Sequence, residues 1–509
     1  MISDSEWDDA QKFDNFNTVY PFSLKQAPKK TEAYIFSNKE GIFIGFKNYQ
    51  PSEFMNSIKS SRDVMNDSDA NVVVIDFANN GIEAFEFVIN SSGTFIDGTF
   101  TNGNDLSRDW DGNWQGAVSK GDDYWSSEIF IPWTVATLPS NKTDYRQIRL
   151  MFGRYIYEDN VWVSTIKSSY SRKEFLSKLT PLEIKNYTSS KLSFFPYISS
   201  QTDSVLETKL EKVGADIFWN TGDGRQINAT FNPDFGQAES DDLVVNFSAQ
   251  ETFFNEKRAF FTENHSLFTI KDRDKFTVIN TRRIGSVPDY NCLQSADEEA
   301  CNASKKTYSD LDYAFRFTQK KDNFDIGLFV ASESDEPFSK GKKFSAFRSR
   351  GKVGEATFGH VITNVKNEFT GEASTVNAID FDKIYSDKIR IASTILSSKV
   401  EDIMLTGDAI PAISENTTIQ DAVIKMDKFR LGVVFILNPE GGISGILTDG
   451  DVRHLIAKNM FDNEKDISEV MTHDPKRLII GSQVFDALNT MEKHQITILP
   501  VTTNSGKVV

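Results

Sequence analysis

Two polar side chains near the C-terminus have the types and spacing needed to bind hydroxyl or phosphate groups together. Thr448 and Asp451 follow the apolar stretch "GISGIL" and precede "VRHLI", so they lie where a strand is predicted to turn into a helix. A carboxylate at such a turn can accept hydrogen bonds from both hydroxyls of a ribose, and the threonine hydroxyl can reach a phosphate. Backbone N–H groups at the helix start also suit an anion. The alternative is that Thr448 and Asp451 only cap the helix.

The other reactive side chains form no catalytic or metal-binding pattern in the sequence. There is no G-x-S-x-G motif, and no spacing among the many acidic residues singles out the carboxylate pair of a glycosidase. The five histidines are scattered, and "NPDFGQAESDD" lacks the spacing of an EF-hand loop. We therefore predict a non-catalytic protein without a metal site.

The two cysteines, Cys292 and Cys301, flank a polar loop. A local disulfide between them would fit a chain exported to an oxidising compartment, and two free thiols are the alternative. Their spacing matches no zinc-binding pattern.

Three successive regions must position these side chains. Residues 1–165 read as many short strands separated by turns, such as the hairpin "TEAYIFSNKEGIFIGFKN", and this pattern indicates a β-sandwich. One stretch, "SEFMNSIKSSRDV", could form a short helix.

Residues 190–398 contain longer strands of roughly 9–11 residues with strong alternation. In "YSDLDYAFRFTQK" the pattern puts Leu311, Tyr313, Phe315 and Phe317 on one face, and in "FDIGLFVASE" it puts Phe324, Ile326, Leu328 and Val330 on one face. This is the signature of a transmembrane β-barrel, and a large soluble antiparallel sheet is the alternative.

Residues 400–509 contain an internal repeat. The segments 419–436 and 484–501 align at a constant offset that matches Asp421 with Asp486 and Met426 with Met491. Each copy reads as a short amphipathic helix followed by an apolar strand, so we expect a pseudo-symmetric α/β pair.

The totals limit the classes of protein. The 509 residues carry a formal net charge of −17, which argues against nucleic acid as a partner because phosphate binding requires a basic face. No apolar run is long enough for a transmembrane helix, and the acidic, polar start "MISDSEWDDAQKFD" shows no signal peptide.

The repeat resembles a tandem CBS (cystathionine-β-synthase) domain pair, and "VEDIMLTGDAIP", "GILTDGDVRH", "VMTHDP" and "ALNTMEKHQIT" resemble the regulatory tail of arabinose-5-phosphate isomerases. The resemblance implies a cytoplasmic module that binds an adenine nucleotide, AMP or ATP, through Thr448 and Asp451. The isomerase activity is not implied, because nothing before Val400 resembles the sugar-isomerase domain. The second copy lacks the closing strand, its Thr-x-x-Asp and the final helix.

Residues 1–398 resemble bacterial proteins in which a domain like carbohydrate-binding module family 9 precedes an uncharacterised outer-membrane β-barrel. The resemblance rests on "DSEWDDA", "WDGNWQGAV", "YWSSEIFIPW" and "NTRRIGSVP", and above all on the long motif at 228–264. It implies export to the outer membrane or periplasm, with an oligosaccharide or cell-surface glycan as partner. The barrel stops short of its usual strand count.

A sugar-binding sandwich would place aromatic rings against the apolar face of a pyranose and carboxylates on its hydroxyls. The alternative is that these rings belong to the core and that Asp111-Gly112 marks a turn. The candidate sugar-binding residues are Trp110, Trp114, Trp125 and Glu128, with Asp109 and Asp111 beside them.

We therefore expect a mainly β protein: a carbohydrate-binding-like sandwich (1–165), an incomplete outer-membrane-type barrel (190–398) and a CBS pair (400–509). The function hypothesis is a non-catalytic envelope binding protein. The alternatives are a regulatory CBS-domain protein without its catalytic domain and a carbohydrate-active hydrolase. The two resemblances meet within residues 398–400 without a linker, and their compartments conflict. This predicts that two unrelated proteins are joined in one reading frame, by gene fusion or by an assembly error.

Overall fold

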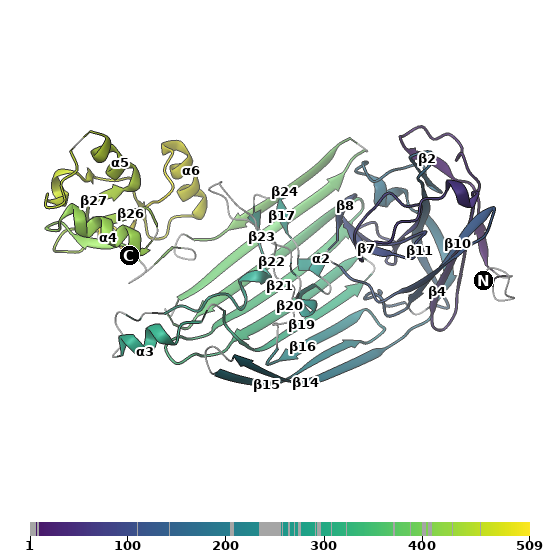
Figure 1. The fold of residues 1–509 in the computed structure, drawn as a ribbon, viewed down its shortest axis with the longest axis horizontal. Coiled ribbons are helices and arrows are strands. Elements are labelled where there is room, and N and C mark those ends of the chain that lie inside the picture. The colour runs from purple at the N-terminus through teal and green to yellow at the C-terminus, as the bar shows by residue number, and fades with distance from the viewer. Residues whose placement is uncertain are drawn as a thin grey trace.

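The computed structural model divides into three consecutive parts that run from end to end (Figure 1). A β-sandwich lies at one end of a long curved sheet, and a small α/β tail lies at the other. The structure describes residues 7, 10–108, 110–141, 143–203, 208–233, 256, 258–262, 265–268, 270–272, 276–290, 292, 297–306, 308–321, 323–369, 372–386, 388–399, 404–405, 410–429, 431–458 and 460–509.

The sandwich is built from two antiparallel sheets, as the short alternating strands predict. The predicted "NKEG" hairpin is confirmed, because β3 and β4 pair from Ser37 with Ile42 outward. The smaller sheet has the order β1 (Gln11–Phe13), β3 (Thr31–Ser37), β4 (Gly41–Tyr49), β10 (Tyr124–Pro132), β9 (Gln115–Lys120). The larger sheet has the order β2 (Asn17–Tyr20), β12 (Val161–Ser164), β11 (Tyr145–Ile156), β5 (Ala70–Asp76), β6 (Glu83–Asn90), β7 (Phe95–Thr101), β8 (Asp105–Ser107), and β13 (Thr180–Lys185) pairs with β11.

The core of the sandwich lies between the two sheets and is rich in aromatic and β-branched side chains. Phe46, Phe87 and Phe152 are fully buried there, together with Ile44 and Val73. Removing these side chains from water stabilises the packing of the two sheets against each other. The helix considered for "SEFMNSIKSSRDV" does not form beyond the 3-10 turn η2 (Ser52–Phe54), and a second such turn, η3 (Phe175–Lys178), covers the larger sheet.

The middle part is one nine-stranded antiparallel sheet whose strands follow the chain order and curl into a partial barrel (Figure 1). The expected mainly β fold, with a partial barrel after a sandwich, is thereby confirmed. Its strands are β14 (Lys191–Asp203), β15 (Thr208–Asn220), β16 (Arg225–Phe231), β19 (Leu311–Lys321), β20 (Phe324–Glu333), β21 (Lys342–Val353), β22 (Ala356–Asn367), β23 (Glu372–Ile384) and β24 (Arg390–Ser397).

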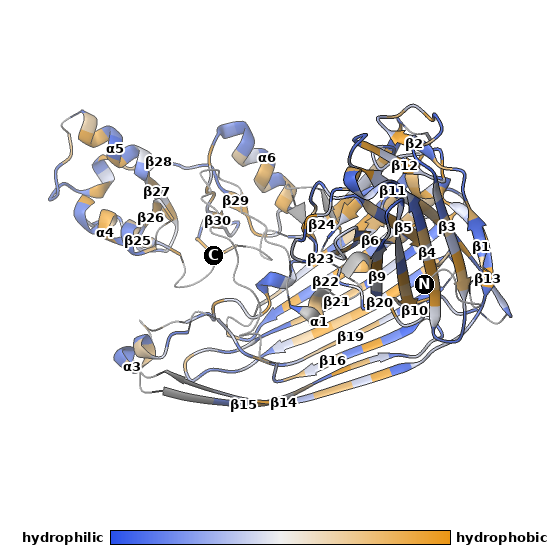
Figure 2. Ribbon diagram, turned by 45° about the vertical axis from the view of Figure 1, so that its right-hand side comes forward, coloured by the Kyte–Doolittle hydropathy of each residue, from blue (hydrophilic) through white to orange (hydrophobic). Residues whose placement is uncertain are grey.

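The two faces of this sheet differ sharply, and apolar and polar residues alternate along its strands (Figure 2). We call the face that carries Phe317, Leu328 and Phe347 the outer face; these three residues are cross-strand neighbours. Large apolar side chains follow this face across every strand, with 38% to 80% of their area exposed: Leu192, Phe194, Ile198, Val213, Trp219, Phe231, Tyr313, Phe324, Leu328, Phe347, Val353, Phe358, Ile379, Ile391 and Ile395.

One residue of the predicted outer face lies on the other side. Leu311 is 1% exposed and packs with Phe261, Phe329 and Ala331. The pairing of β19 with β20 shifts between Leu311 and Tyr313, so a β-bulge reverses the alternation before Tyr313. The alternation of apolar and polar residues in the sequence does not reveal this extra residue.

The inner face is covered by the long connection between β16 and β19. Phe260 and Phe261 from α1 (Ala259–Thr262) and Leu267 from α2 (His265–Phe268) pack on it. Gly327 is needed on β20, because a Cβ there would lie 2.5 Å from Cζ of Phe268. The connection also contains β17 (Lys271–Asp272), β18 (Phe276–Thr277), η4 (Thr281–Arg283) and α3 (Glu298–Ala303).

Two buried arginines on the inner face bind a carboxylate or a carbonyl oxygen. Arg350 donates to Asp325 at 2.9 Å, and the Nε of Arg348 donates to the carbonyl oxygen of Leu267 at 3.2 Å. Cys292 and Cys301 form a disulfide in the same connection, which decides between the two alternatives left open by the sequence. The predicted motif at 228–264 lies largely outside the described residues.

The tail confirms the internal repeat. Its helices α4 (Ile419–Phe429) and α6 (Val484–His494) have the same length, and each joins two parallel strands. The first copy contains β25 (Ala412–Ser414), β26 (Val433–Leu437), β27 (Ile443–Thr448) and α5 (Asp449–Ala457). After these come η8 (Ile467–Glu469), β28 (Thr472–His473), β29 (Leu478–Ile479) and β30 (Val501–Thr502).

The tail and the curved sheet meet at residues 398–399. The backbone N–H of Val484 donates to the carbonyl oxygen of Ser398 at 3.2 Å, and Lys399 forms a β-bridge with Gln483. None of the helices in the described part of the chain has the length and apolar character needed to cross a bilayer.

Candidate functional site

A pocket of about 260 Å³ opens on the larger sheet of the sandwich, on the side away from the inter-sheet core. Its floor crosses neighbouring strands: Tyr155 of β11 is paired with Trp162 of β12 on one side and with Ala70 of β5 on the other. Asn90 of β6 is the next partner of Ala70. The remaining lining residues are Met65, Asn66, Asp67, Ser68, Ile96 and Asn160.

The pocket combines an aromatic platform with polar side chains. The rings of Tyr155 and Trp162 lie 5.0 Å apart between centroids at an interplanar angle of 32°. The hydroxyl of Tyr155 donates to Oδ1 of Asn160 at 3.0 Å, which fixes the platform to the turn at 157–160. Burial raises the pKa of Tyr155, so its hydroxyl stays protonated and keeps its hydrogen bond to Asn160 over the physiological range.

The loop at 65–68 forms a polar rim beside this platform. The side chain of Asn66 donates to the carbonyl oxygen of Ile58 at 2.8 Å, and its Oδ1 accepts from the backbone N–H of Ser68 at 3.1 Å. The carboxylate of Asp67 is exposed at the same rim. Aromatic faces with amides and one carboxylate around them are the groups that hold a small polyhydroxylated ligand.

The structure places the sequence-predicted tryptophans elsewhere, in or near the sandwich core. Trp114 is 4% exposed and packs against Phe95 with ring centroids 4.6 Å apart. Trp110 packs edge-to-face on Phe85 at 4.8 Å. Trp125 is 1% exposed, and the guanidinium of Arg154 lies 6.0 Å from its ring centroid. These three side chains therefore form no common surface among the described residues.

The predicted acidic partners are also separated. Glu128 lies on β10 of the smaller sheet, where one of its carboxylate oxygens is buried. Asp109 lies outside the described residues. Asp111 is exposed near Arg62, with 3.1 Å between Oδ1 and Nε. Sugar contact by Trp110, Trp114, Trp125 or Glu128 stays a prediction, and none of these four residues lines the pocket described above.

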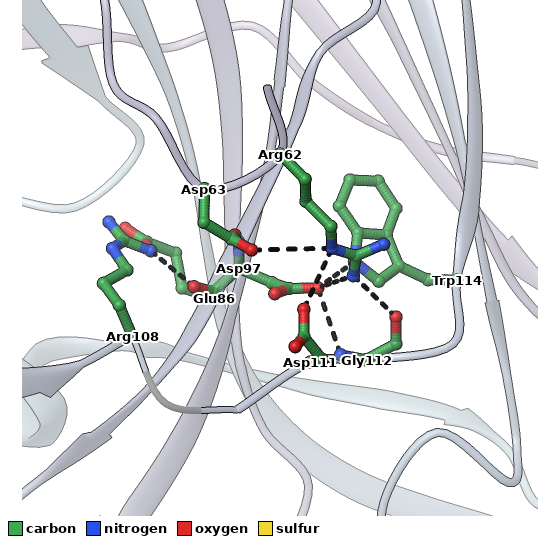
Figure 3. A network of polar contacts seen from close by, with 8 residues as sticks. All are labelled: Arg62, Asp63, Glu86, Asp97, Arg108, Asp111, Gly112 and Trp114. Carbon is green, nitrogen blue, oxygen red and sulfur yellow. Dashed lines mark hydrogen bonds and ion pairs between the residues drawn. The ribbon is translucent and has the colours of Figure 1, made fainter. Parts of the chain in front are cut away.

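Trp114 instead belongs to a polar network centred on Asp97 (Figure 3). Its indole N–H donates to Oδ2 of Asp97 at 2.6 Å, and the backbone N–H of Gly112 donates to the same oxygen at 3.1 Å. Arg62 lies against this carboxylate with 2.5 Å between NH2 and Oδ2. Burial raises the pKa of Asp97 to about 6, in spite of these donors.

Three carboxylates come together in this network. Oxygens of Asp63, Asp97 and Asp111 lie within 4.8 Å of one another. The guanidinium of Arg62 is within 4.0 Å of all three residues, so its positive charge offsets part of their negative charge. The network ties the loop before β9 to β7 of the larger sheet through Asp97.

The predicted nucleotide-binding pair lies where the sequence places it, at the β27–α5 turn. Thr448 is the N-cap of α5, and its Oγ1 accepts from the backbone N–H of Asp451 at 3.2 Å. The carboxylate of Asp451 accepts from the backbone N–H of Thr448 at 2.9 Å. This reciprocal capping box stabilises the helix start and holds both half-buried side chains at one edge of the turn.

Sequence reasoning missed Tyr155 and Trp162. They lie in "RYIYEDNVWVST", which reads as two strands and a turn. A useful signal was present: the aromatic residues directly face each other across a tight turn that contains Asn160 in a left-handed conformation (φ +49°).

Comparisons with known proteins match two separate parts of the chain. Residues 188–337 match a domain of unknown function, DUF5916. Residues 400–458 and 467–509 match the CBS domain, so the tail is a CBS domain pair. The matches include no isomerase catalytic domain.

The tail resembles that of arabinose 5-phosphate isomerase KdsD. The chain is 33% identical over 111 residues to this enzyme of Francisella tularensis, covering 22% of the chain and 34% of the enzyme. It is 36% identical over 121 residues to an uncharacterized protein of Rickettsia prowazekii, covering 23% of the chain and 36% of that protein. The chain thus spans about a third of the length of these curated relatives.

Two solved structures are also similar to part of the chain. A CBS domain protein from Pyrobaculum aerophilum complexed with AMP has 18% identity and a TM-score of 0.19, covering 21% of this chain and 79% of that one. A CBS domain pair in complex with 5′-methylthioadenosine and S-adenosyl-L-methionine has 25% identity and a TM-score of 0.21, covering 22% and 86%.

Proposed function

We propose that this protein is a non-catalytic binding protein of the bacterial envelope. In this proposal the curved sheet lies in the outer membrane, and the sandwich binds a saccharide in the Tyr155–Trp162 pocket. The observation that carries the proposal is the inverted polarity of the sheet, whose outer face is apolar while its inner face is charged.

The outer face has the properties of a lipid-facing surface. Ile198, Leu192 and Ile395 expose 80%, 66% and 69% of their area, and such residues continue from β14 to β24. A monomeric protein in water rarely exposes a continuous apolar surface larger than a few hundred Å². The strands β19 to β22 have 10 to 12 residues, which suits tilted strands that cross a bilayer.

The inner face supports the same proposal. Arg316 donates to the carbonyl oxygen of Phe261 at 3.3 Å, and Arg350 is paired with Asp325, so charges point away from the outer face. A polar interior filled by part of the chain is a known arrangement in outer-membrane barrels. A soluble sheet of this size would bury its apolar face and expose its charges.

Membrane association can be tested by exporting the full chain behind a cleavable signal peptide in a Gram-negative host. We expect it in the outer-membrane fraction, resistant to extraction with urea. A chain that appears wholly in the soluble periplasmic fraction would reject the lipid-facing role.

Saccharide binding by the sandwich rests on the pocket itself. Tyr155 and Trp162 supply the stacking surface, and the exposed carboxylate of Asp67 at the rim can accept hydrogen bonds from hydroxyls. We expect isothermal titration of the full chain with a panel of oligosaccharides to give heat of binding that Trp162→Ala abolishes.

A matched control comes from the sequence-predicted set. Trp110→Phe keeps an aromatic ring near the core and should leave the titration unchanged, because Trp110 does not line the pocket. Loss of binding in Trp110→Phe with retention in Trp162→Ala would move the site to the sequence-predicted residues.

A second candidate function is adenine-nucleotide binding by the tail. The capping box holds Thr448 and Asp451 at the N-terminus of α5, where backbone N–H groups favour an anion. Titration of the full chain with AMP and ATP should give binding that Asp451→Ala removes and that Asp486→Ala, on α6, leaves intact. Absence of heat with every nucleotide would leave the tail without this role.

A further inference from the structure

The two ends of the curved sheet carry connections of very different length. At the end near the sandwich, strands are joined by residues 221–224, 322–323, 354–355 and 385–389. At the far end they are joined by 204–207, 334–341, 368–371 and the long connection 232–310. The long connection contains the disulfide and the helices that fill the inner face.

The sandwich is fixed to the end with the short connections. Lys320, near the end of β19, forms an ion pair with Glu83 of the sandwich, and both side chains are at least nine-tenths buried. The ammonium of Lys352, near the end of β21, donates to the carbonyl oxygen of Asn80. Arg390, at the start of β24, lies 3.2 Å from Asp105.

Of these three contacts the Lys320–Glu83 ion pair is buried, whereas Asp105 in the third contact is half-exposed. Removing one partner of a buried ion pair leaves an uncompensated charge in a dry environment, which costs roughly 3–5 kcal/mol. The contacts come from three different strands of the sheet, β19, β21 and β24, so the sandwich is held against this end of the sheet at three points (Figure 1).

Strand direction fixes what lies at the opposite end. The sheet has nine strands in chain order, each antiparallel to its neighbour, so β14 and β24 run in the same direction, away from the sandwich. Ser398 and the tail therefore follow at the far end, together with the long connection (Figure 1).

Outer-membrane barrels have short turns on the periplasmic side and longer loops on the extracellular side. We infer that the sandwich faces the periplasm, so that its pocket takes a saccharide from the periplasmic space and not a glycan of the cell surface. This inference rests on the proposed function, because sidedness requires the sheet to lie in the membrane.

In this orientation the disulfide connection and the tail lie on the extracellular side, away from the nucleotides of the cytoplasm.

The strand directions also limit how the sheet can close. Because β14 and β24 run in the same direction, an antiparallel arrangement can join them only through an odd number of further strands. A second copy inserted in the same orientation would place its β14 parallel to β24 of the first copy. Such a pair of edges therefore cannot continue the antiparallel sheet.

Cysteine labelling tests the orientation in the full chain. Both native cysteines are in the disulfide, so the wild-type chain is the unlabelled control. Lys340→Cys places a thiol in the 334–341 connection, and Glu355→Cys places one in the 354–355 turn; both positions are exposed. The chains are exported as above and treated with a membrane-impermeant maleimide before and after permeabilisation of the outer membrane.

We expect Lys340→Cys to react in intact cells and Glu355→Cys to react at least tenfold more after permeabilisation than before it. The reverse pattern, or equal reaction of both variants in intact cells, would overturn the orientation while leaving membrane insertion in place. Complete extraction of both chains by urea would overturn the proposed function and the orientation with it, and the extraction assay distinguishes this outcome from the other two.

Discussion

The sandwich and the curved sheet are neighbouring antiparallel β structures, and they bury opposite kinds of side chain. In the sandwich Phe87 is 0% exposed, between two sheets. In the curved sheet Phe358 is 47% exposed on the outer face, while Arg348 is 3% exposed on the inner face. The strands of both parts alternate with a period of two, so alternation by itself does not show whether a face meets water or lipid. The distribution of charged side chains between the two faces does show it.

The comparison also separates two sources of stability. Apolar burial from water stabilises the sandwich by a collapsed core. Among the described residues, the curved sheet has two smaller apolar clusters on its inner face, around Phe261 and Phe329 and around Val361, and it buries several arginines beside them. In our account, lipid covers the apolar side chains of the outer face and so removes them from water.

The largest expected effect comes from truncating the same residue type in the two regions. Phe87→Ala should lower the free energy of unfolding of the sandwich by about 3–5 kcal/mol, because a buried ring is replaced by a cavity. Phe358→Ala should leave that transition unchanged. Urea unfolding of the full chain followed by tryptophan fluorescence measures this, since six of the seven tryptophans lie between residues 7 and 162. Equal destabilisation by both variants would contradict the distinction.

Introducing a lysine on the outer face of the curved sheet, and one on the exposed side of the sandwich, tests the same difference. Leu328→Lys places an ammonium in the middle of β20, between Phe317 and Phe347, and should destabilise the membrane-inserted sheet by about 2–4 kcal/mol. Ala117→Lys, at an exposed position of β9, should change stability by less than about 0.5 kcal/mol. Refolding yield into lipid vesicles is the measurement; equal yields for the two variants would argue that the outer face meets water.

The buried carboxylate of the sandwich gives a pH dependence with a defined sign. Burial raises the pKa of Asp97 from 3.8 to about 6, so the folded chain binds more protons than the unfolded chain between these values. The free energy of unfolding should therefore fall as pH rises from about 4 to 6, by about 3 kcal/mol at most from this group. The decline should be shallower in Asp97→Asn, as measured by urea unfolding at each pH. A decline of equal slope in both chains would assign it to other groups.

The smallest effect is expected in the tail, from a change that removes one helix cap and leaves the apolar contact of α5 through Val452 in place. Thr448→Ala removes the N-cap and should lower local stability by about 1 kcal/mol. Faster hydrogen exchange of the α5 amides, with unchanged exchange in the sandwich, would show this. Unchanged exchange in α5 would mean that the capping box does not hold the helix.

The sequence was informative where the structure depends on local pattern. The repeat in the tail was predicted from matched residues such as Asp421 and Asp486, and the structure gives α4 and α6 at the same offset. The apolar face of β20 was predicted from alternation and is confirmed at Phe324 and Leu328. Where a bulge interrupts a strand, as at Leu311, alternation gave the wrong face.

The candidate site could not be predicted in the same way. Tryptophan is equally suited to a sugar platform and to a core, and its role depends on which sheet face it meets. Trp114 packs in the inter-sheet core. Trp162 lines a surface pocket together with residues of four other strands and of two loops. This pocket arises from strand order, which the sequence does not state directly. The proposed joining of two unrelated proteins at residues 398–400 likewise stays a prediction, which long-read sequencing across these codons can test.

The central claim is that the outer face of the curved sheet lies in lipid, and Trp219 tests it most directly. It is the one tryptophan in residues 190–398 and lies on this face with 41% of its area exposed. The full chain is refolded into vesicles of ordinary or brominated phosphatidylcholine, and fluorescence is compared with that of Trp219→Phe. Our account predicts quenching by brominated lipid that disappears in Trp219→Phe. Equal fluorescence of the wild-type chain in both lipids, with the chain bound to the vesicles, would contradict it.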